Sequence, residues 1–397
     1  MSRTLAQALA SIGESISVMN GIKNDIRTAI EAKGVAVPDG TTFAVYPELI
    51  AAIESGGSVN GNGMVGFNLP PRFLYASYKR RITIKAGTIL PLKVADETKY
   101  FIAADDIEIN INDILDDDAL EAGTDYYIFL VPDDNNPAGL NIKASHTKEA
   151  PAGFTAGEVY LFGGFHSLCA NVGTGLTYVE GGITKDHPLN GYITGDILPQ
   201  SVWCLNHRPH SEPEGMVYIP PLDFWCDIYL QSGSGPNTKS AFGGAITRSR
   251  QYVDFVEDQL CVNKALLNDE EFASAMLGSN EQTSVLGASE AGATAGGAGG
   301  RKDTANRRMI SIYGVEEGCG SLYQWLATTS AAEGSSWNAQ NGGKGSYYGG
   351  AYALRAGGVW DGSSGCGSRC RIANSSRASS DSYIGGRGRS RNIRVFV

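Results

Sequence analysis

The sequence predicts a multidomain protein in which an N-terminal helical, coiled-coil-like segment and a small all-β domain precede a C-terminal α+β domain. Three observations predict this. At 397 residues the chain is longer than one ordinary domain, so two or three domains are expected. Its 51 glycines favour turn-rich β structure over a helical bundle. Apolar residues follow a helical spacing near the N-terminus and a period of two farther along.

The first segment, residues 1–57, is predicted to be a helical oligomerisation or attachment segment. Over residues 5–30 apolar side chains recur at alternating intervals of four and three, which is the spacing of a coiled-coil seam. A seam this narrow needs a partner helix, so we expect self-association. Packing of the helix on its own domain is the alternative. A Gly- and Ser-rich linker follows at residues 55–63.

Residues 64–165 are predicted to form a β-sandwich or barrel-like spacer domain. Apolar residues alternate at period two in several short runs, and residues 125–131 have the composition of a buried strand. An acidic stretch at 105–118 lacks the glycine and glutamate positions of an EF-hand loop, so we interpret it as the solvated face of a strand. Residues 166–200 are expected to be a Gly-rich connection.

The last domain is predicted to span residues 201–397 and to contain two helices. One is expected around residues 248–260. Asn268 is expected to cap the other, because Glu271 follows at the capping-box spacing. Residues 287–300 are of low complexity and are expected to form a mobile loop.

Composition disfavours several classes of partner. The net charge of −10 disfavours nucleic acid, whose phosphates favour dense positive charge. No apolar run reaches about 18 residues, so we expect no membrane insertion. The N-terminus lacks the apolar region of a signal peptide, so folding in a cytoplasm is expected. Seven cysteines, an odd number and widely spread, suit buried thiols better than a disulfide framework.

The sequence contains no convincing catalytic or cofactor motif. Cys204, His207 and His210 are the best metal candidates, but the paired spacing typical of zinc sites is missing. Cys366 and Cys370 could form a reactive pair only if their thiols were activated, and buried structural thiols are favoured. The glycine strings lack the phosphate-loop pattern, and no Ser/His/Asp arrangement stands out. We therefore expect no metal, no cofactor and no catalytic residue.

The last forty residues predict a binding surface. Small, chemically mixed side chains lie between Gly, Trp and Arg anchors, as they would if one rigid frame carried interchangeable contact residues. The candidate ligand-binding residues are Val359, Asp361, Ser363, Ser364, Gly365, Ile372, Asn374, Ser375, Ser379, Ser380, Asp381, Ser382 and Tyr383. The candidate flanking residues are Tyr347, Tyr348 and Tyr352, and the candidate scaffold residues are Gly357, Gly358, Trp360, Gly385, Gly386, Arg387 and Gly388.

The scaffold glycines 385, 386 and 388 are expected to permit either positive φ or close backbone packing. Arg387 is expected to lie in a buried ion pair or to donate to carbonyls. Glu316 and Glu317 are its possible partners.

The anchors Gly357-Gly358-Val359-Trp360-Asp361-Gly362, Cys366-Gly367-Ser368-Arg369 and Ile384-Gly385-Gly386-Arg387-Gly388 resemble the variable region of proteins diversified by diversity-generating retroelements. Residues 201–209 and 213–218 resemble the opening of the same domain in phage members. The resemblance covers about residues 200–397. It implies a C-type-lectin fold closely related to that of formylglycine-generating enzymes. It also implies randomised AAY codons, which cannot yield Lys, Glu, Gln or Met, and none of these occurs in residues 359–383.

The resemblance further implies a receptor-binding adhesin at the tip of a phage or prophage tail fibre, within the virion. Its implied partners are a host cell-surface receptor, protein or glycan, and other tail proteins bound through the N-terminus. A homotrimer is expected by analogy with tail fibres. Two alternatives stay open: a lectin-fold enzyme of the formylglycine-generating type, and a variable protein displayed on a bacterial cell surface without a virion.

Overall fold

The computed structural model forms two units, Met1–Asn68 and Leu69–Val397. Within residues 69–393 it describes everything except 95–96, 117–118, 286–298, 302, 305–306, 331–334, 338–345 and 349–351. Of the first 68 residues it describes only 23, 24, 26–28, 31 and 37. Six of these, all but residue 37, are helical, and the Arg27 Nε atom lies 2.9 Å from Glu31 Oε1. The rest of the predicted coiled-coil segment, and most of the loop predicted at 287–300, fall outside the described residues.

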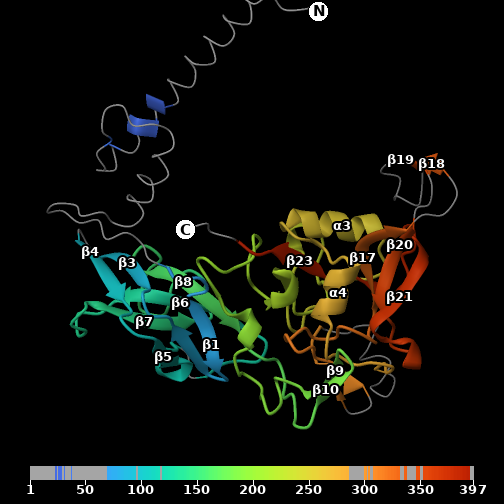
Figure 1. Cartoon of the computed structure of the whole chain (residues 1–397), viewed down its shortest axis with the longest axis horizontal. Coiled ribbons are helices and arrows are strands. Elements are labelled where there is room, and N and C mark those ends of the chain that lie inside the picture. Colours follow the sequence, from blue (N-terminus) through green and yellow to red (C-terminus); the bar gives the residue numbers. More distant parts are fainter. Residues whose placement is uncertain are drawn as a thin grey trace, which may run out of the picture. The chain divides into compact units, whose positions relative to one another are not determined.

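The all-β domain is built from three antiparallel sheets (Figure 1). The first contains β1 (Leu74–Tyr78), β2 (Arg81–Ile84) and β5 (Ile107–Asn110), and the second pairs β3 (Ile89–Val94) with β4 (Glu97–Ile102). The third has the order β11-β8-β6-β7, with β6 at Asp125–Pro132, β7 at Leu140–Ser145, β8 at Tyr160–His166 and β11 at Trp203–Cys204.

One apolar core joins these three sheets. Ile82, Leu90 and Ile128 are completely buried in it, one from each sheet. The period-two alternation in the sequence therefore corresponds to strands with one buried face. Of the acidic stretch, Glu108 is exposed on β5, whereas Asp105 and Asp106 are exposed in the bend before that strand, so the predicted solvated strand face holds only for Glu108 among these three.

The domain limits differ from those that composition suggested. Because β11 pairs with β8, the sheet of the all-β domain includes residues 203–204. These residues lie beyond the predicted end of that domain at residue 165 and inside the predicted C-terminal domain, which was expected to start at residue 201. The segment between is more than a linker, since it contains the hairpin β9 (Thr177–Glu180) and β10 (Ile183–Asp186). A boundary inferred from glycine content cannot show which distant strand a segment pairs with.

In the residues that the structure describes, the C-terminal domain combines two four-stranded sheets with two helices. One sheet has the order β12-β13-β23-β14, with β12 at Met216–Ile219, β13 at Phe224–Asp227, β14 at Ala265–Leu266 and β23 at Gly388–Arg391. The other has the order β21-β20-β17-β22, with β17 at Tyr323–Ser330, β20 at Tyr352–Gly357, β21 at Gly367–Ser376 and β22 at Ile384–Gly385. Two short ladders pair β15 (Asp303–Thr304) with β16 (Arg307–Arg308), and β18 (Ser335–Trp337) with β19 (Ser346–Tyr348).

Both predicted helices are present, as α3 (Tyr252–Cys261) and α4 (Asp269–Ala275). The capping box of α4 is complete: Asn268 Oδ1 accepts from the Glu271 amide and Glu271 Oε2 accepts from the Asn268 amide, each at 2.8 Å. Three acidic residues in the first turn of α4 also interact favourably with the helix dipole. In the part of the chain that the structure describes, no helix has the length and apolar character needed to cross a membrane.

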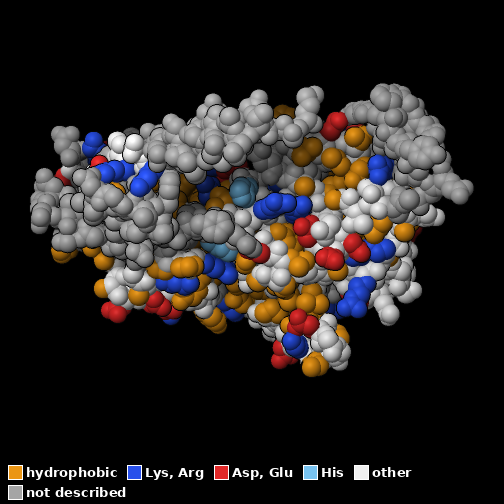
Figure 2. Space-filling model, turned by 45° about the horizontal axis from the view of Figure 1, so that its top comes forward, with side chains coloured by type: hydrophobic (Ala, Val, Ile, Leu, Met, Phe, Trp, Pro, Cys, Tyr) orange, Lys and Arg blue, Asp and Glu red, His pale blue; other side chains and the backbone are white. Residues whose placement is uncertain are grey.

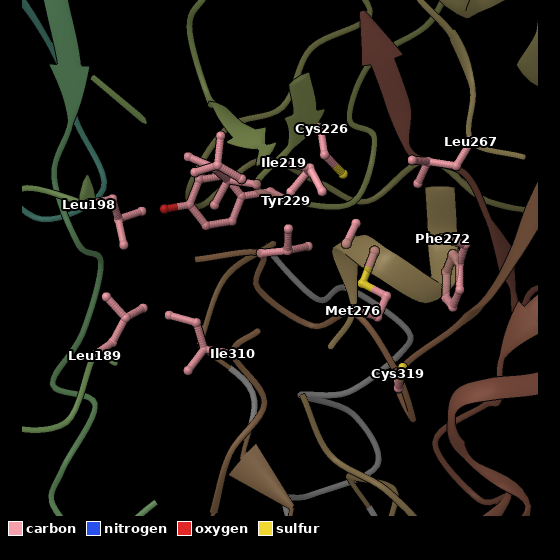
Figure 3. Close-up of a cluster of buried hydrophobic side chains, with 14 of the residues drawn as sticks. Leu189, Leu198, Ile219, Cys226, Tyr229, Leu267, Phe272, Met276, Ile310 and Cys319 are labelled. Carbon is pink, nitrogen blue, oxygen red and sulfur yellow. The ribbon is translucent and has the colours of Figure 1, made fainter. Parts of the chain in front are cut away.

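The connecting segment and the C-terminal domain share one core (Figure 3). Leu189 and Leu198 come from the connection and pack in the same cluster as Tyr229, Met276 and Ile310. Hydrogen bonds also tie the all-β domain to the C-terminal domain. His166 Nε2 lies 3.0 Å from the Tyr229 hydroxyl, and the Tyr127 hydroxyl donates to Glu214 Oε1 at 2.8 Å.

His187, in the connection, makes the fold sensitive to acid. Its Nδ1 accepts from the Leu189 amide at 3.2 Å, and its Nε2 lies 3.2 Å from the Ile310 carbonyl, so the ring must be neutral. Burial lowers the pKa of His187 to about 4. An unfolded histidine has a pKa of about 6.5, so the unfolded state binds more protons as the pH falls below that value. Stability that is present above pH of about 6.5 is therefore lost as the pH falls towards 4.

We expect this residue to account for about 2 kcal/mol of unfolding free energy lost between pH 7 and 5. His187→Asn keeps an acceptor for the Leu189 amide but does not titrate, so its pH dependence should be shallower by that amount. Urea unfolding at the two pH values measures the difference. An unchanged pH dependence in the variant would contradict this assignment.

Candidate ligand-binding surface

The candidate residues lie on and around the edge strand β21 (Figure 1). This strand pairs antiparallel with β20, and Ile372 lies opposite Arg355 while Ser375 lies opposite Ala353. The ladder shifts register between Ala353 and Arg355, which marks a bulge or irregularity. β20 pairs in turn with β17, so two strands support the edge strand from one side.

The buried side chain of Arg387 links separate segments of the C-terminal domain by hydrogen bonds. Its side chain is completely buried and donates four hydrogen bonds. Nε donates to Gln324 Oε1 at 3.1 Å, and Nη2 donates to the Glu316 carbonyl at 2.8 Å. Nη1 donates to the carbonyls of Asp227 and Ile228. Burial lowers the pKa of Arg387, and the nearby charges of Asp227 and Glu317 oppose this effect.

The expected donation of Arg387 to carbonyls is therefore confirmed, whereas its ion pair with Glu316 is not formed. The Glu316 carboxylate accepts from both terminal nitrogens of Arg308, at 2.8 and 2.5 Å, and only its carbonyl accepts from Arg387. Glu316 thus links two arginines, one through its side chain and one through its backbone.

The scaffold glycines serve two different purposes. Gly357 and Gly358 have φ values of 90° and 84°, which side chains other than glycine rarely adopt. Gly386 and Gly388 do not have positive φ but lie in tight contacts. A Cβ atom would come within 2.6 Å of Phe255 Cδ1 at position 386 and within 2.2 Å of Gln259 Oε1 at position 388. Close packing thus explains these two glycines.

Most of the candidate ligand-binding residues reach solvent. Asp361, Ser363, Ser364, Gly365, Asn374, Ser380 and Ser382 are exposed, and Ile372, Ser379, Asp381 and Tyr383 are half-buried. Ser363–Gly365 form a short 3-10 helix, in which the Ser363 amide donates to Ser284 Oγ at 3.3 Å.

Val359 and Ser375 are corrections to the predicted surface. Val359 is 8% exposed because its backbone bridges to Ser321 beside the sheet. Ser375 is 2% exposed because its hydroxyl faces inward and accepts from Arg355 Nε. Both residues therefore belong to the buried scaffold beneath the candidate surface and not to the surface itself.

Of the three candidate flanking tyrosines, only Tyr352 has a side chain that the structure describes. Tyr352, in β20, is half-buried and lies opposite Ser376 of β21. The side chains of Tyr347 and Tyr348 lie outside the described residues, so their flanking role stays a prediction.

Comparison with known proteins places the chain in a family. Residues 72–204 match the family described as the Mtd second domain. The chain is 30% identical to the "Tail fiber receptor-binding protein" of Bordetella phage BPP-1 over 329 residues, which cover 77% of this chain and 78% of that protein. Among solved structures it resembles the "Major Tropism Determinant P3c Variant" and the "Major Tropism Determinant U1 Variant", with TM-scores of 0.64 and 0.63 and identities of 27% and 26%. Each match covers 81% of this chain and 84% of the other.

This chain belongs to the major tropism determinant family. The mostly β architecture with few helices matches the C-type-lectin-like fold of the major tropism determinant structures. The relation to formylglycine-generating enzymes, which the motifs also implied, has no support from these comparisons.

The surface of this major tropism determinant homologue includes an aromatic residue that the sequence did not single out, Tyr323. Tyr323, in β17, is half-buried, and its ring lies 6.3 Å from that of Tyr383. Trp360 lies 6.2 Å from the same ring. The guanidinium of Arg355 lies 5.4 Å from the centre of the Tyr323 ring. The period-two pattern of Tyr323 and Trp325 could have indicated a shared strand face, but not which segments would meet there.

The cysteines of the candidate surface lack the character of reactive thiols. Cys366 is buried and donates to the Val359 carbonyl at 3.2 Å. Burial raises the pKa of Cys366 to about 11 and also raises that of Cys370. A nucleophilic thiol needs the opposite shift, because the thiolate is the reactive form.

The predicted metal candidates have other roles in this homologue. The His207 ring packs on Tyr218 and Trp225, with ring centroids 4.4 and 5.3 Å away. Cys204 is completely buried in β11. Among the residues that the structure describes, no three His, Cys, Asp or Glu side chains come together in a way that could hold a metal ion.

Proposed function

We propose that this protein is a receptor-binding adhesin at the tip of a phage or prophage tail fibre, located in the virion. Its ligand is a receptor on the surface of the host cell, either protein or glycan. The observation that carries this proposal is the contrast between exposed and buried residues in one segment. Asp361, Asn374 and Ser382 are exposed, whereas Gly386, Arg387 and Gly388 are buried. Family membership agrees with it, since the relatives are a tail-fibre receptor-binding protein and tropism determinants.

The chemistry of the exposed set suits recognition of a varied ligand. Tyr383 offers a rigid aromatic area, and a hydrogen bond with Asp381 raises its pKa. Serine, asparagine and aspartate side chains supply adaptable hydrogen bonds. The proposed retroelement diversification would replace such side chains while leaving the buried frame intact.

We further propose that the protein acts as a homotrimer attached to other tail proteins through its N-terminal segment. Individually weak contacts gain overall affinity when several copies bind one cell surface together. Figure 2 shows basic and acidic side chains interspersed over the described part of one face, so that this part has no single sign of charge. A mixed surface of this kind supports specific contacts better than general attraction to a polyanion.

The alternatives have less support. An enzyme of the formylglycine-generating type would require an activated thiol, and burial raises the pKa of Cys366 and Cys370. A variable protein on a bacterial cell surface would use the same exposed residues, but the relatives named above belong to phage tails.

The test is binding of the purified, fluorescently labelled protein to cells of the bacterium that hosts the phage or prophage. The triple variant Asp361→Asn, Asn374→Tyr and Ser382→Tyr should lose at least about tenfold in binding, since three changes on the binding surface, two of them to a much larger side chain, should together cost about 1.4 kcal/mol or more.

A matched control places similar changes in the exposed loop between β6 and β7. Asp134, Asn135 and Ala138 are exposed there, and Asp134→Asn, Asn135→Tyr and Ala138→Tyr should leave cell binding unchanged. Equal binding by the two triple variants would overturn the proposed function.

A further inference from the structure

Three candidate ligand-binding residues, Ile372, Asp381 and Tyr383, and the buried Ser375 of the same segment converge on one residue outside it, Arg355 of β20. Ile372 lies opposite it in the ladder, and Ser375 Oγ accepts from its Nε. Asp381 Oδ2 lies 3.9 Å from its Nη1, and the centre of the Tyr383 ring lies 6.0 Å from its guanidinium carbon. The segment from residue 359 to residue 383 thus surrounds a cation that precedes it in the chain.

The guanidinium of Arg355 is held between aromatic rings. Besides Tyr383, the rings of Tyr323 and Trp325 lie 5.4 and 5.6 Å from the guanidinium carbon. Only 12% of the side chain is exposed. Aromatic faces stabilise a cation and keep water away from it, so they help to hold this one in place.

One donor of this guanidinium is unused. Nη1 is buried and has no hydrogen-bond partner among the described residues. A buried donor without an acceptor costs about 1–3 kcal/mol, and a bound ligand that supplies an acceptor recovers this free energy. A carboxylate is the best match, because charge-assisted hydrogen bonds to arginine are about twice as strong as neutral ones.

Asp381 opposes the binding of such a ligand. Its side chain is 44% exposed, and its Oδ2 lies 3.9 Å from Nη1, beyond hydrogen-bond distance. In this position it balances the charge of Arg355 and repels an incoming anion. A neutral residue at position 381 would remove the repulsion and leave the donor unchanged.

We propose that Arg355 is an anion-recognition residue of the ligand-binding surface and that residue 381 controls access to it. Asp381 closes the site to carboxylates, and a neutral residue at that position opens it to a carboxylate of the receptor. The proposal rests on the proposed function, in which position 381 is replaceable and Arg355 belongs to the constant frame. One substitution would then change the charge class of ligand that the same frame accepts.

The experiment measures binding of two fluorescein-labelled probes, a hexaglutamate peptide and a trigalacturonate, to the full chain by fluorescence anisotropy at about 0.1 M salt, where charges more than about 10 Å apart are largely screened. Asp381→Asn should increase the affinity for at least one probe about fivefold to tenfold, the effect of removing one charge about 4 Å from the bound carboxylate at a partly exposed site. The probe that responds distinguishes an acidic peptide from an acidic sugar as the source of the carboxylate.

The chain offers a matched control in Asp134, which is exposed in the loop between β6 and β7, outside the proposed ligand-binding surface, and forms no ion pair with a described residue. Asp134→Asn removes the same charge and should change the affinity less than about twofold, as expected of a screened surface charge. Arg355→Gln combined with Asp381→Asn should return the affinity to that of the original chain, and Arg355→Lys in the same background should retain part of the gain.

An equal gain in Asp134→Asn, or a gain that persists in the Arg355→Gln double variant, would overturn the proposal. No gain in Asp381→Asn would do the same. If the Arg355→Gln variant does not fold, the comparison of Asp381→Asn with Asp134→Asn still decides. Because the assay needs neither host cell nor receptor, its outcome is separate from that of the cell-binding test.

Discussion

Replacing Arg387 by methionine is expected to lower the free energy of unfolding by about 4 kcal/mol. Methionine fills a similar volume but leaves the Gln324 side-chain oxygen and the carbonyls of Asp227, Ile228 and Glu316 without this donor. These acceptors belong to three separate stretches of the chain, so the loss should affect the whole C-terminal domain. Thermal and urea unfolding of the two proteins measure the change.

A control for this substitution lies on the strand that follows. Arg391 ends β23 and is exposed, so Arg391→Met should cost no more than about 0.5 kcal/mol. Arg387→Lys should fall between the two, because lysine keeps the charge but cannot present donors as a planar fork. If Arg387→Met were no more destabilising than Arg391→Met, Arg387 would not be the centre of the frame.

Glu316→Gln is expected to cost about 3 kcal/mol, because it leaves the Arg308 cation buried without its counter-charge. Arg308 and Glu316 are 6% and 1% exposed, and two hydrogen bonds join them. The double variant Arg308→Met with Glu316→Leu should recover much of this loss, since it removes both charges and keeps the apolar volume. Urea unfolding of the single and double variants measures the coupling.

The exposed pair of Lys185 and Glu180 provides the comparison. Its side chains are 45% and 47% exposed, so Glu180→Gln should change stability by less than about 0.5 kcal/mol. Equal costs for Glu316→Gln and Glu180→Gln would show that burial does not matter to the Arg308 pair.

Local features of the fold could be predicted from the sequence because their causes lie within a few residues. The capping box of α4 needs only Asn268 and Glu271, three residues apart, and both hydrogen bonds are present. Strands such as β2 and β6 follow from alternating or continuous apolar runs. The glycine neighbours of Arg387 indicated close backbone packing, which the contacts at positions 386 and 388 confirm, but they left open whether its guanidinium would bind a carboxylate or carbonyls.

Pairing between distant strands could not be predicted. Trp203 and Cys204 belong to the β8 sheet rather than to the domain that follows them, and nothing nearby in the sequence shows this. The burial of Val359 and Ser375 has the same origin. A bridge to Ser321 and a hydrogen bond from Arg355 decide which way these side chains face.

The importance of Arg355 also depends on distant contacts. In the sequence it is an ordinary arginine in a strand, close to the candidate segment but not part of it. Only the ladder with β21 and the approach of Tyr323 from β17 give it a position among the candidate ligand-binding residues. The composition of the segment predicted which residues form the surface, but only tertiary contacts show that Arg355 lies among them.

The central claim is that a stable buried frame carries an exterior whose contact residues can be replaced. Thermal unfolding of the triple variant Asp361→Asn, Asn374→Tyr and Ser382→Tyr, measured beside the original chain, tests it most directly. We predict melting temperatures that agree within about 2 °C, because exposed substitutions change stability by no more than about 0.5 kcal/mol each. A fall of about 10 °C or more would show that these residues belong to the core, and would contradict the account.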